Sequence, residues 1–180
     1  MQAKNTPDSY GAVTKTFHWV IALLIVCLLG IGLYMDFLAD KLQRFALMPW
    51  HKSFGITVLA LATLRVLWHL SSRPPGFVAG LKDWEMQAAR AVHILLYMAM
   101  FVMPLSGWLM SSAAGRTTKF FWLFDLPDLI GKDDHLRELF GAIHECSAYA
   151  LIILIAGHAG AALKHHFIGK DATLRRMLPF

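Results

Sequence analysis

The chain has 180 residues, of which 57% are hydrophobic and only 16% are charged, and its mean hydropathy is +0.50. This composition is too apolar for an ordinary soluble domain and indicates an integral membrane protein. The formal net charge is +5, but the basic residues are scattered around the ends of apolar segments. Because no element gathers them into a patch, we expect no nucleic-acid partner.

Four apolar segments follow one another along the chain, after a polar N-terminal stretch with no signal-peptide cleavage pattern. They cover residues 17–35, 50–70, 90–111 and 142–163. Each is about 20 residues long, which suits a hydrocarbon core of about 30 Å. Nothing in them alternates as barrel strands do, and a backbone in lipid must satisfy its own hydrogen bonds. We therefore predict an all-α, integral membrane four-helix bundle, with residues 1–180 forming a single domain and the first span retained.

The third connection, residues 112–141, is the longest and contains the aromatic run KFFWLFDLPDLI. This run is too short to span a bilayer and is interrupted by Pro127. It suits either a segment lying in the outer membrane interface or a loop packed over the end of the bundle.

The distribution of lysine and arginine predicts the orientation of the bundle. If the N-terminus is inside, ten of the 17 basic residues fall on the cytoplasmic side. These ten are Lys4, Lys15, Arg65, Arg73, Lys82, Arg90, Lys164, Lys170, Arg175 and Arg176. The positive-inside rule therefore favours both termini in the cytoplasm.

The chain has nine histidines, and five of them are candidate ligands inside the apolar segments. The other four, at span ends or in polar connections, are expected to face solvent or lipid headgroups; they are His69, His135, His165 and His166. With alternating helix direction, His18, His93 and His158 come to the inner level, and His51 and His144 come to the outer level. His144 and His158 share the last span; 14 residues of helix separate them by roughly 21 Å along the axis and only about 40° around it. Ionisable side chains in a membrane usually face the protein interior for a functional reason.

Two levels of histidines suggest two haem groups, each held between two imidazoles from facing helices. The outer level offers one pairing, His51 with His144. The inner level offers three pairings among His18, His93 and His158, and spacing does not choose between them. A lone histidine at the end of a span is more simply interfacial, but five at two depths favour cofactor ligation.

Small and basic residues in the spans suit a bulky planar guest that carries carboxylates. Close helix packing explains the glycines equally well, and these are Gly30, Gly32, Gly55, Gly107, Gly157 and Gly160. Arg65, Arg90 and Lys52 are candidates to neutralise haem propionates at their respective faces. Reaching toward lipid headgroups is the simpler explanation for any one of these cations.

Several other kinds of chemistry lack their motifs in this sequence. There is no C-x-x-C-H for covalent haem attachment, and no H-E-x-x-H, nucleophile elbow, Walker or dinucleotide motif. Cys27 lies in the middle of a span and Cys146 at the start of another, so we expect no disulfide between them.

Five segments together resemble the bacterial cytochrome b561 family over nearly the whole chain. They are KTFHW (15–19), WHKSFG (50–55), PLSGWLM (104–110), HE (144–145) and GHAGAALKHHFIGKDATLRRMLP (157–179). The resemblance implies a di-haem b protein of the bacterial inner membrane with two non-covalent haems. It implies iron ligation by His18 with His158 and by His51 with His144, with His93 beside the inner haem.

The same resemblance implies electron transfer between membrane quinone and a small donor or acceptor at the outer face. Superoxide oxidation is the activity implied for close relatives, so we expect an oxidoreductase of the superoxide:quinone type. Lys52, with Lys119 or Lys132 nearby, would attract an anionic donor locally, although the outer face is slightly acidic as a whole.

Two further functions are compatible with the sequence, as is a homodimer. One is a cytochrome b subunit that anchors a dehydrogenase or hydrogenase in the membrane. The other is a histidine-lined metal transporter without haem, which the apolar stretches between the two histidine levels disfavour.

Overall fold

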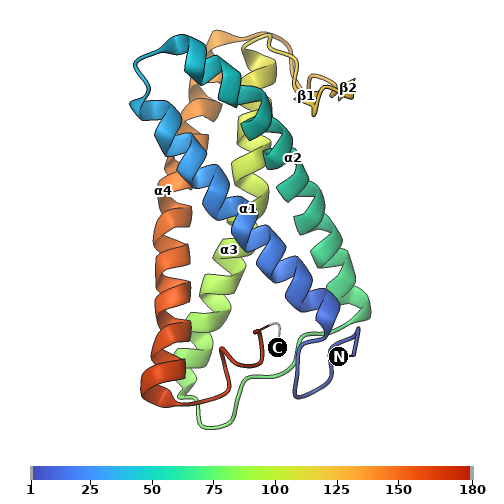
Figure 1. The fold of residues 1–180 in the computed structure, drawn as a ribbon, viewed down its shortest axis with the longest axis vertical. Coiled ribbons are helices and arrows are strands. Elements are labelled where there is room, and N and C mark those ends of the chain that lie inside the picture. The colour runs from blue at the N-terminus through green and yellow to red at the C-terminus, as the bar shows by residue number, and fades with distance from the viewer. Residues whose placement is uncertain (1, 179–180) are drawn as a thin grey trace.

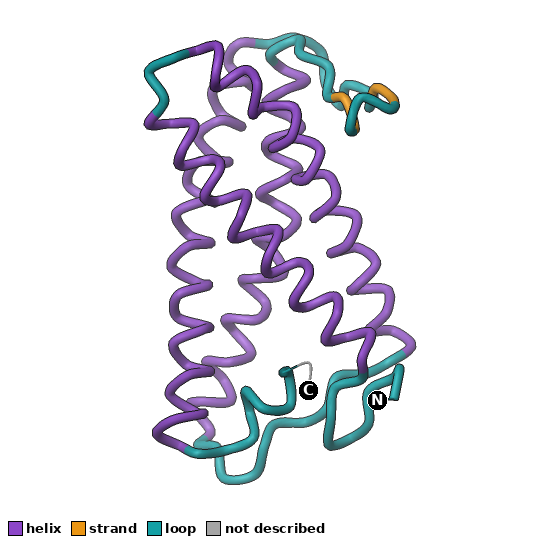
Figure 2. Tube along the Cα trace, in the orientation of Figure 1, coloured by secondary structure: helices purple, strands orange, loops and turns teal. Residues whose placement is uncertain are grey.

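The computed structural model describes residues 2–178 and is built from four long helices, with a short hairpin at one end (Figures 1 and 2). The elements are α1 (Ala12–Phe37), α2 (Lys41–Ser71), α3 (Asp83–Ala113), β1 (Lys119–Phe120), β2 (Phe124–Asp125), α4 (Asp134–Lys164) and the π-helical turn η1 (His165–Gly169). The predicted all-α four-helix membrane bundle is confirmed. The N-terminal residues and the segment after η1 lie at the same end of the bundle (Figure 1).

Each predicted span lies inside an observed helix, and the helices continue beyond the apolar residues at both ends. With 26 to 31 residues, they are about 39–47 Å long, more than the hydrocarbon core requires. Polar side chains stabilise the added turns by capping them. The Asp40 carboxylate accepts a 2.8 Å hydrogen bond from Leu42 N, and Asp133 accepts one of 2.9 Å from Leu136 N.

The surface of the bundle is apolar, which fits a lipid surrounding. All four helices are long and apolar enough to cross a membrane, and 17% or less of each apolar stretch is buried inside the protein. Large apolar side chains such as Leu23 and Ile153 are 66% and 71% exposed. A soluble bundle would bury these large apolar side chains. Their exposure therefore indicates contact with lipid acyl chains.

The buried core lies between the two histidine levels and contains residues from all four helices. Its cluster consists of Ile21, Ile25, Val58, Ala62, Met100 and Leu151. Leu151, only 2% exposed, falls midway between His144 and His158 in α4. This arrangement makes the centre of the bundle apolar and leaves the histidines toward its two ends.

The connection between α3 and α4 packs on α2 through a two-stranded hairpin, in which Phe120 pairs with Phe124. Ser53 of α2 binds the hairpin twice: its hydroxyl donates to Lys119 O at 3.1 Å and accepts from Phe121 N at 2.9 Å. The tip of the hairpin exposes Trp122 and other apolar side chains. The connection is therefore attached to the bundle end and also presents an aromatic surface suited to the membrane interface.

The chain after η1 turns back beneath the bundle, and we call residues 170–178 the C-terminal strap. Lys15 Nζ donates to Leu178 O at 2.7 Å, and Trp19 Nε1 donates to Met177 O at 2.9 Å. The strap thus contacts α1 on both sides of His18.

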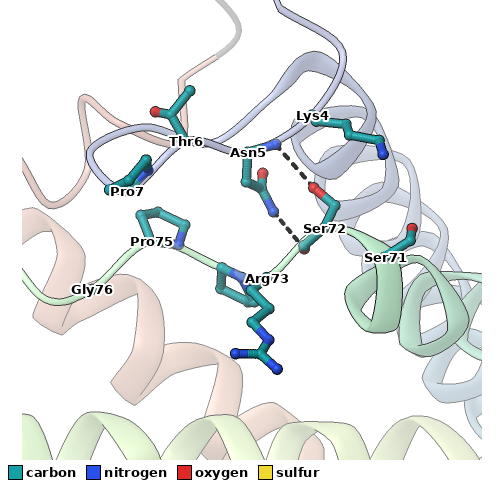
Figure 3. Close-up of a pocket in the computed structure, with 10 residues that line it drawn as sticks. Lys4, Asn5, Thr6, Pro7, Ser71, Ser72, Arg73, Pro75 and Gly76 are labelled. Carbon is teal, nitrogen blue, oxygen red and sulfur yellow. Dashed lines mark hydrogen bonds between the residues drawn. The ribbon is translucent and has the colours of Figure 1, made fainter.

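The N-terminal segment is attached to the connection between α2 and α3 (Figure 3). Asn5 N donates to Ser72 Oγ and Asn5 Nδ2 donates to Ser72 O, both at 2.9 Å. A side chain at Gly11 would collide with the backbone of Ala3 and Lys4, so this bend requires glycine.

Candidate functional site

The structure brings the histidines into facing pairs at two levels, which keep the names outer and inner from the predicted orientation. At the outer level, the ring centroids of His51 on α2 and His144 on α4 are 6.2 Å apart. At the inner level, His18 on α1 and His158 on α4 are also 6.2 Å apart. All four side chains are half-buried. The same helix, α4, thus contributes one ring to each pair, as its 14-residue spacing predicts.

His93 on α3 belongs to the inner level as well, but it stands in a different relation to His158. Their ring centroids are 5.2 Å apart and the planes meet edge to face at 71°. His158 therefore has two imidazole neighbours. His93 is the closer one, and His18 is at the same distance that separates the two rings of the outer pair.

The outer pair has a hydrogen-bonding pattern that orients one ring and leaves the other unsatisfied. His144 Nδ1 donates to the carbonyl oxygen of Met103 on α3 at 2.8 Å, and Ser106 Oγ lies 3.3 Å from the same nitrogen. The neutral ring then keeps the lone pair of Nε2 free. His51 Nδ1 is buried and has no hydrogen-bond partner among residues 2–178, a condition that folded interiors rarely tolerate.

A cavity of about 500 Å³ adjoins the outer pair, and both histidines line it. Its volume is within the range of about 300–1,000 Å³ typical of ligand pockets. Gly107 makes room for His144, since an added Cβ would lie 2.9 Å from His144 Cε1. A Cβ at Gly32 would lie 3.6 Å from His51 Cε1. Gly107 and Gly32 therefore lie directly against the two histidine rings of the outer pair.

Close helix packing does not explain the remaining small residues of the spans. An added Cβ would meet nothing within 4 Å at Gly30, Gly55, Gly157 or Gly160. Gly55 lines the outer cavity, so its missing side chain enlarges that space.

The three basic candidates lie in different surroundings. Arg65 Nη2 is 3.5 Å from His18 Nδ1, and its guanidinium carbon lies 5.3 Å from the centroid of Tyr97. Lys52 lines the outer cavity and its Nζ donates to Ser111 Oγ, which itself donates to Arg116 O at 2.7 Å. Arg90 is exposed over the ring of Phe77, at 5.4 Å.

Known proteins resemble this chain over almost its entire length. The family model for prokaryotic cytochrome b561 matches residues 9–180. Cytochrome b561 homolog 2 of Escherichia coli strain K12 is 37% identical over 99% of this chain and 95% of that protein.

The chain belongs to the prokaryotic cytochrome b561 family. Cytochrome b561 homolog 1 of the same strain is 31% identical over 90% of this chain and 92% of its own length. The protein named probable superoxide oxidase CybB of Yersinia pestis is 28% identical over 94% of this chain and 96% of its own. The chain is therefore a bacterial multi-pass membrane protein that binds haem b and transfers electrons.

Some residues around the histidines of this cytochrome b561 could not be identified from sequence. The Met103 carbonyl and Ser106 orient His144, and only tertiary structure reveals a backbone group as a partner. Arg176 contacts Tyr10 and Gly76 because the C-terminal strap returns to the N-terminal segment and the connection between α2 and α3. No local pattern marks them.

A second cavity, of about 550 Å³, lies at the inner end of the cytochrome, beside the Asn5–Ser72 contact (Figure 3). Lys4 and Arg73 line it together with prolines and small polar residues, and no histidine is among the lining residues. It is separate from the histidine pairs. Among residues 2–178, no group of three or more His, Cys, Asp or Glu side chains is arranged to hold a metal ion.

Proposed function

We propose that the protein holds two haem b groups, one at each histidine level, and conducts electrons across the membrane between a quinone and superoxide at the outer face. His51 and His144 would be the axial ligands of the outer haem, and His18 and His158 those of the inner haem. The observation that carries this proposal is the shared 6.2 Å separation of the two ring pairs.

The separation matches what an iron between two imidazoles requires. A metal ion binds an imidazole nitrogen at about 2 Å, and the ring centroid lies roughly 1 Å behind that nitrogen, so two axial rings have centroids roughly 6 Å apart. The 5.2 Å between His93 and His158 is shorter than this. His93 is therefore better suited to a place beside the inner haem than to the second axial position.

The hydrogen bond from His144 to Met103 supports the outer assignment. Histidine ligands almost always donate their other ring N–H to a carbonyl or carboxylate, which fixes the tautomer and the orientation of the ring. The 2.8 Å bond to Met103 O does this for His144. The unpartnered Nδ1 of His51 and the glycine-lined cavity further favour a ligand between these rings.

A haem held by two imidazoles would supply one-electron oxidation and reduction and would not bind oxygen at its iron. The protein positions the ligands on facing helices and excludes water. Ile21, Val58, Met100 and Leu151 make the layer between the levels apolar. Such a low-dielectric interior strengthens the effect of any nearby charge on the site.

The donor is proposed from chemistry at the outer cavity and from a relative. The Yersinia pestis protein carries superoxide oxidase in its name, and Lys52 places a cation at the outer cavity. Two superoxide anions would each release one electron and leave as dioxygen. A membrane quinone would take up both electrons with two protons. We place the protein in the inner membrane with both termini in the cytoplasm, following the distribution of lysine and arginine.

The first test is purification in mild detergent, followed by visible spectra and a pyridine haemochrome assay. We expect two haems b per chain, both six-coordinate and unreactive toward carbon monoxide. His144→Ala and His158→Ala should each reduce the content to one haem, whereas His135→Ala, at an exposed position on α4, should keep two. A colourless protein from haem-sufficient cells would refute the proposal. A stable dehydrogenase or hydrogenase complex recovered with the chain would instead favour a membrane-anchor subunit.

A further inference from the structure

Two arginines at the inner end of the bundle have buried nitrogen atoms that no described group satisfies. Arg65 Nε, on α2, and Arg176 Nε, on the C-terminal strap, have almost no accessible surface and no hydrogen-bond partner within residues 2–178. Neither guanidinium forms an ion pair with a carboxylate in that part of the chain. A buried N–H donor without a partner costs free energy, so each Nε calls for an acceptor.

The contacts that Arg65 does make are weak. Its Nη2 lies 3.5 Å from His18 Nδ1, at the long limit of a hydrogen bond. That contact would also require the proton of His18 to reside on Nε2, the nitrogen that an iron would need. Stacking over Tyr97 leaves the in-plane donors of the guanidinium unused. Arg65 therefore retains donors for an acceptor near His18.

Arg176 lies on the strap and contacts the N-terminal segment and the connection between α2 and α3. Its guanidinium carbon lies 5.8 Å from the ring of Tyr10, and its Nη1 donates to Gly76 O at 2.9 Å. Burial raises the pKa of the Tyr10 phenol, and the charges of Arg176 and Arg65 both oppose that rise. The Arg176 guanidinium thus lies beside the Tyr10 ring, and the charge of Arg65 acts on the same phenol.

The strap is fixed beside the helix that carries His18. Lys15 and Trp19 bind strap carbonyls at 2.7 and 2.9 Å, one turn before and one residue after this histidine. Two unsatisfied donors, Arg65 Nε and Arg176 Nε, thus lie at the inner end of the bundle, one on α2 and one on the strap.

We propose that Arg65 and Arg176 together receive the propionate carboxylates of the inner haem, so that loading of this haem fixes the C-terminal strap across the inner end. The inference rests on the proposed function, because it needs a haem at the His18–His158 pair. Guanidinium forks bind carboxylates with two parallel hydrogen bonds. A free phosphate or a lipid phosphate has similar acceptor chemistry, and the test must separate these sources.

Arg175 provides a matched control for Arg176. It is the adjacent residue with the same charge, but it is exposed. Within residues 2–178 its hydrogen bonds are to the carbonyls of Lys170 and Asp171, at 3.4 and 3.5 Å. We compare R176Q with R175Q in the haem-loaded protein in phosphate-free detergent solution. Haem content is measured first, and two haems are expected in both variants.

Two readouts follow, the midpoint potential of each haem and amide hydrogen exchange in residues 170–178. In R176Q the potential of one haem should fall, because a lost positive charge favours the oxidised, more positive state. Strap exchange should accelerate by about tenfold or more, the factor expected when a charge-assisted hydrogen bond is lost. R175Q should change neither, and R176K should give an intermediate potential because it keeps the charge without the fork.

The ligand variants connect the strap to the inner haem independently of any arginine. Strap exchange should accelerate in H158A and stay at the wild-type rate in H144A. Equal exchange in these two variants, or an R176Q protein that matches R175Q in both readouts while two haems are bound, would overturn the inference and leave the proposed function standing. A protein without haem would refute the proposed function instead.

Added phosphate and an added anionic lipid test the two alternative acceptors, a free phosphate and a lipid phosphate. If inorganic phosphate at millimolar concentration, or phosphatidylglycerol in nanodiscs compared with phosphatidylcholine, protects the strap equally in wild type and H158A, the arginines bind a phosphate and the haem assignment is wrong. Protection that depends on His158 and not on either addition supports the propionate assignment.

Discussion

His144 on α4 and Met103 on α3 are joined by a hydrogen bond of 2.8 Å from the imidazole Nδ1 to the backbone carbonyl oxygen. The bond links two neighbouring helices and fixes the ring that faces His51. Gly107, one turn further along α3, lies so close to the same ring that it has no space for a side chain. The position of His144 therefore depends on two backbone features of α3.

Gly107→Ala should disturb the outer histidine pair selectively. The new Cβ would lie 2.9 Å from His144 Cε1, so the ring must move by a few tenths of an ångström or rotate away from Met103. We expect a lower outer-haem content or an altered low-spin signal in electron paramagnetic resonance, with the inner haem unchanged. Gly30→Ala is the control, because its Cβ would meet nothing within 4 Å. Identical haem spectra for both variants would show that the site tolerates this displacement.

Ser53→Ala should loosen the hairpin that covers the outer end of α2. Ser53 is 1% exposed and its hydroxyl satisfies two hairpin backbone groups, Lys119 O and Phe121 N. Loss of these bonds leaves buried groups unsatisfied, which costs about 1–3 kcal/mol. The hairpin also holds Phe121 and Trp122 at φ values of 44° and 61°, a strained region for side chains of this size.

The measurement for Ser53→Ala is thermal unfolding in detergent, together with tryptophan fluorescence from the Trp50–Trp122 contact, whose ring centroids are 4.9 Å apart. We expect a lower Tm and a fluorescence change at temperatures below it. Ser71→Ala serves as a control, since Ser71 is exposed and binds only the carbonyl of Trp68 in its own helix. If both variants melt alike, Ser53 does not hold the hairpin.

The four membrane-spanning helices could be predicted because residues in contact with lipid must be apolar, which hydropathy measures directly. All four expected spans lie inside α1–α4, and only the polar turns at their ends were missed, since capped helix continues past the apolar residues. The two levels of histidine follow from helix direction and spacing. Spacing did not choose among the inner pairings, because this requires the distances between rings on three different helices. The rings of the expected pairs face each other in the structure, and ligation itself stays a prediction.

The contacts that sequence could not predict all join residues distant along the chain. Lys15 meets Leu178 across 163 positions, and Trp19 meets Met177 across 158. The strap has no apolar periodicity that would indicate its return. The aromatic hairpin is similar: KFFWLFDLPDLI suits both the membrane interface and the end of the bundle, and Ser53 attaches it through hydrogen bonds that a sequence pattern does not reveal.

The attachment of the C-terminal strap to η1 should weaken in acid. The carboxylate of Asp171 lies 2.7 Å from His165 Nδ1. Burial raises the pKa of this carboxyl, but hydrogen bonds from Thr173 and His165 outweigh burial and hold the pKa below its ordinary value. A carboxyl with a lowered native pKa stabilises the fold above the unfolded pKa, which is about 3.9, and this contribution disappears as the pH falls through the native value.

Amide exchange of residues 170–178, corrected for the intrinsic pH dependence of exchange, measures this effect. Between pH 7 and about pH 5, protection from the Asp171 carboxylate should stay constant, and it should fall below about pH 4. Asp171→Asn should remove the acid transition, whereas Asp8→Asn, at an exposed position in the N-terminal segment, should retain it. A transition that persists in Asp171→Asn would assign the acid sensitivity to another group.

Lys52→Glu should slow the reaction with superoxide. Lys52 Nζ binds Ser111 Oγ, which fixes a cation at the outer cavity close to the helix end. Asp36 and Glu145 line the same cavity, so the attraction for an anion is local and does not extend over the whole outer face. Charge reversal should therefore lower the second-order rate constant several-fold at low ionic strength and reverse its salt dependence, because salt would then screen repulsion. Lys41→Glu makes the same change at an exposed position on the same helix and should have a smaller effect. If the two variants share one rate and one salt slope, Lys52 does not guide the donor, and superoxide must reach the outer histidine pair without electrostatic help from this residue.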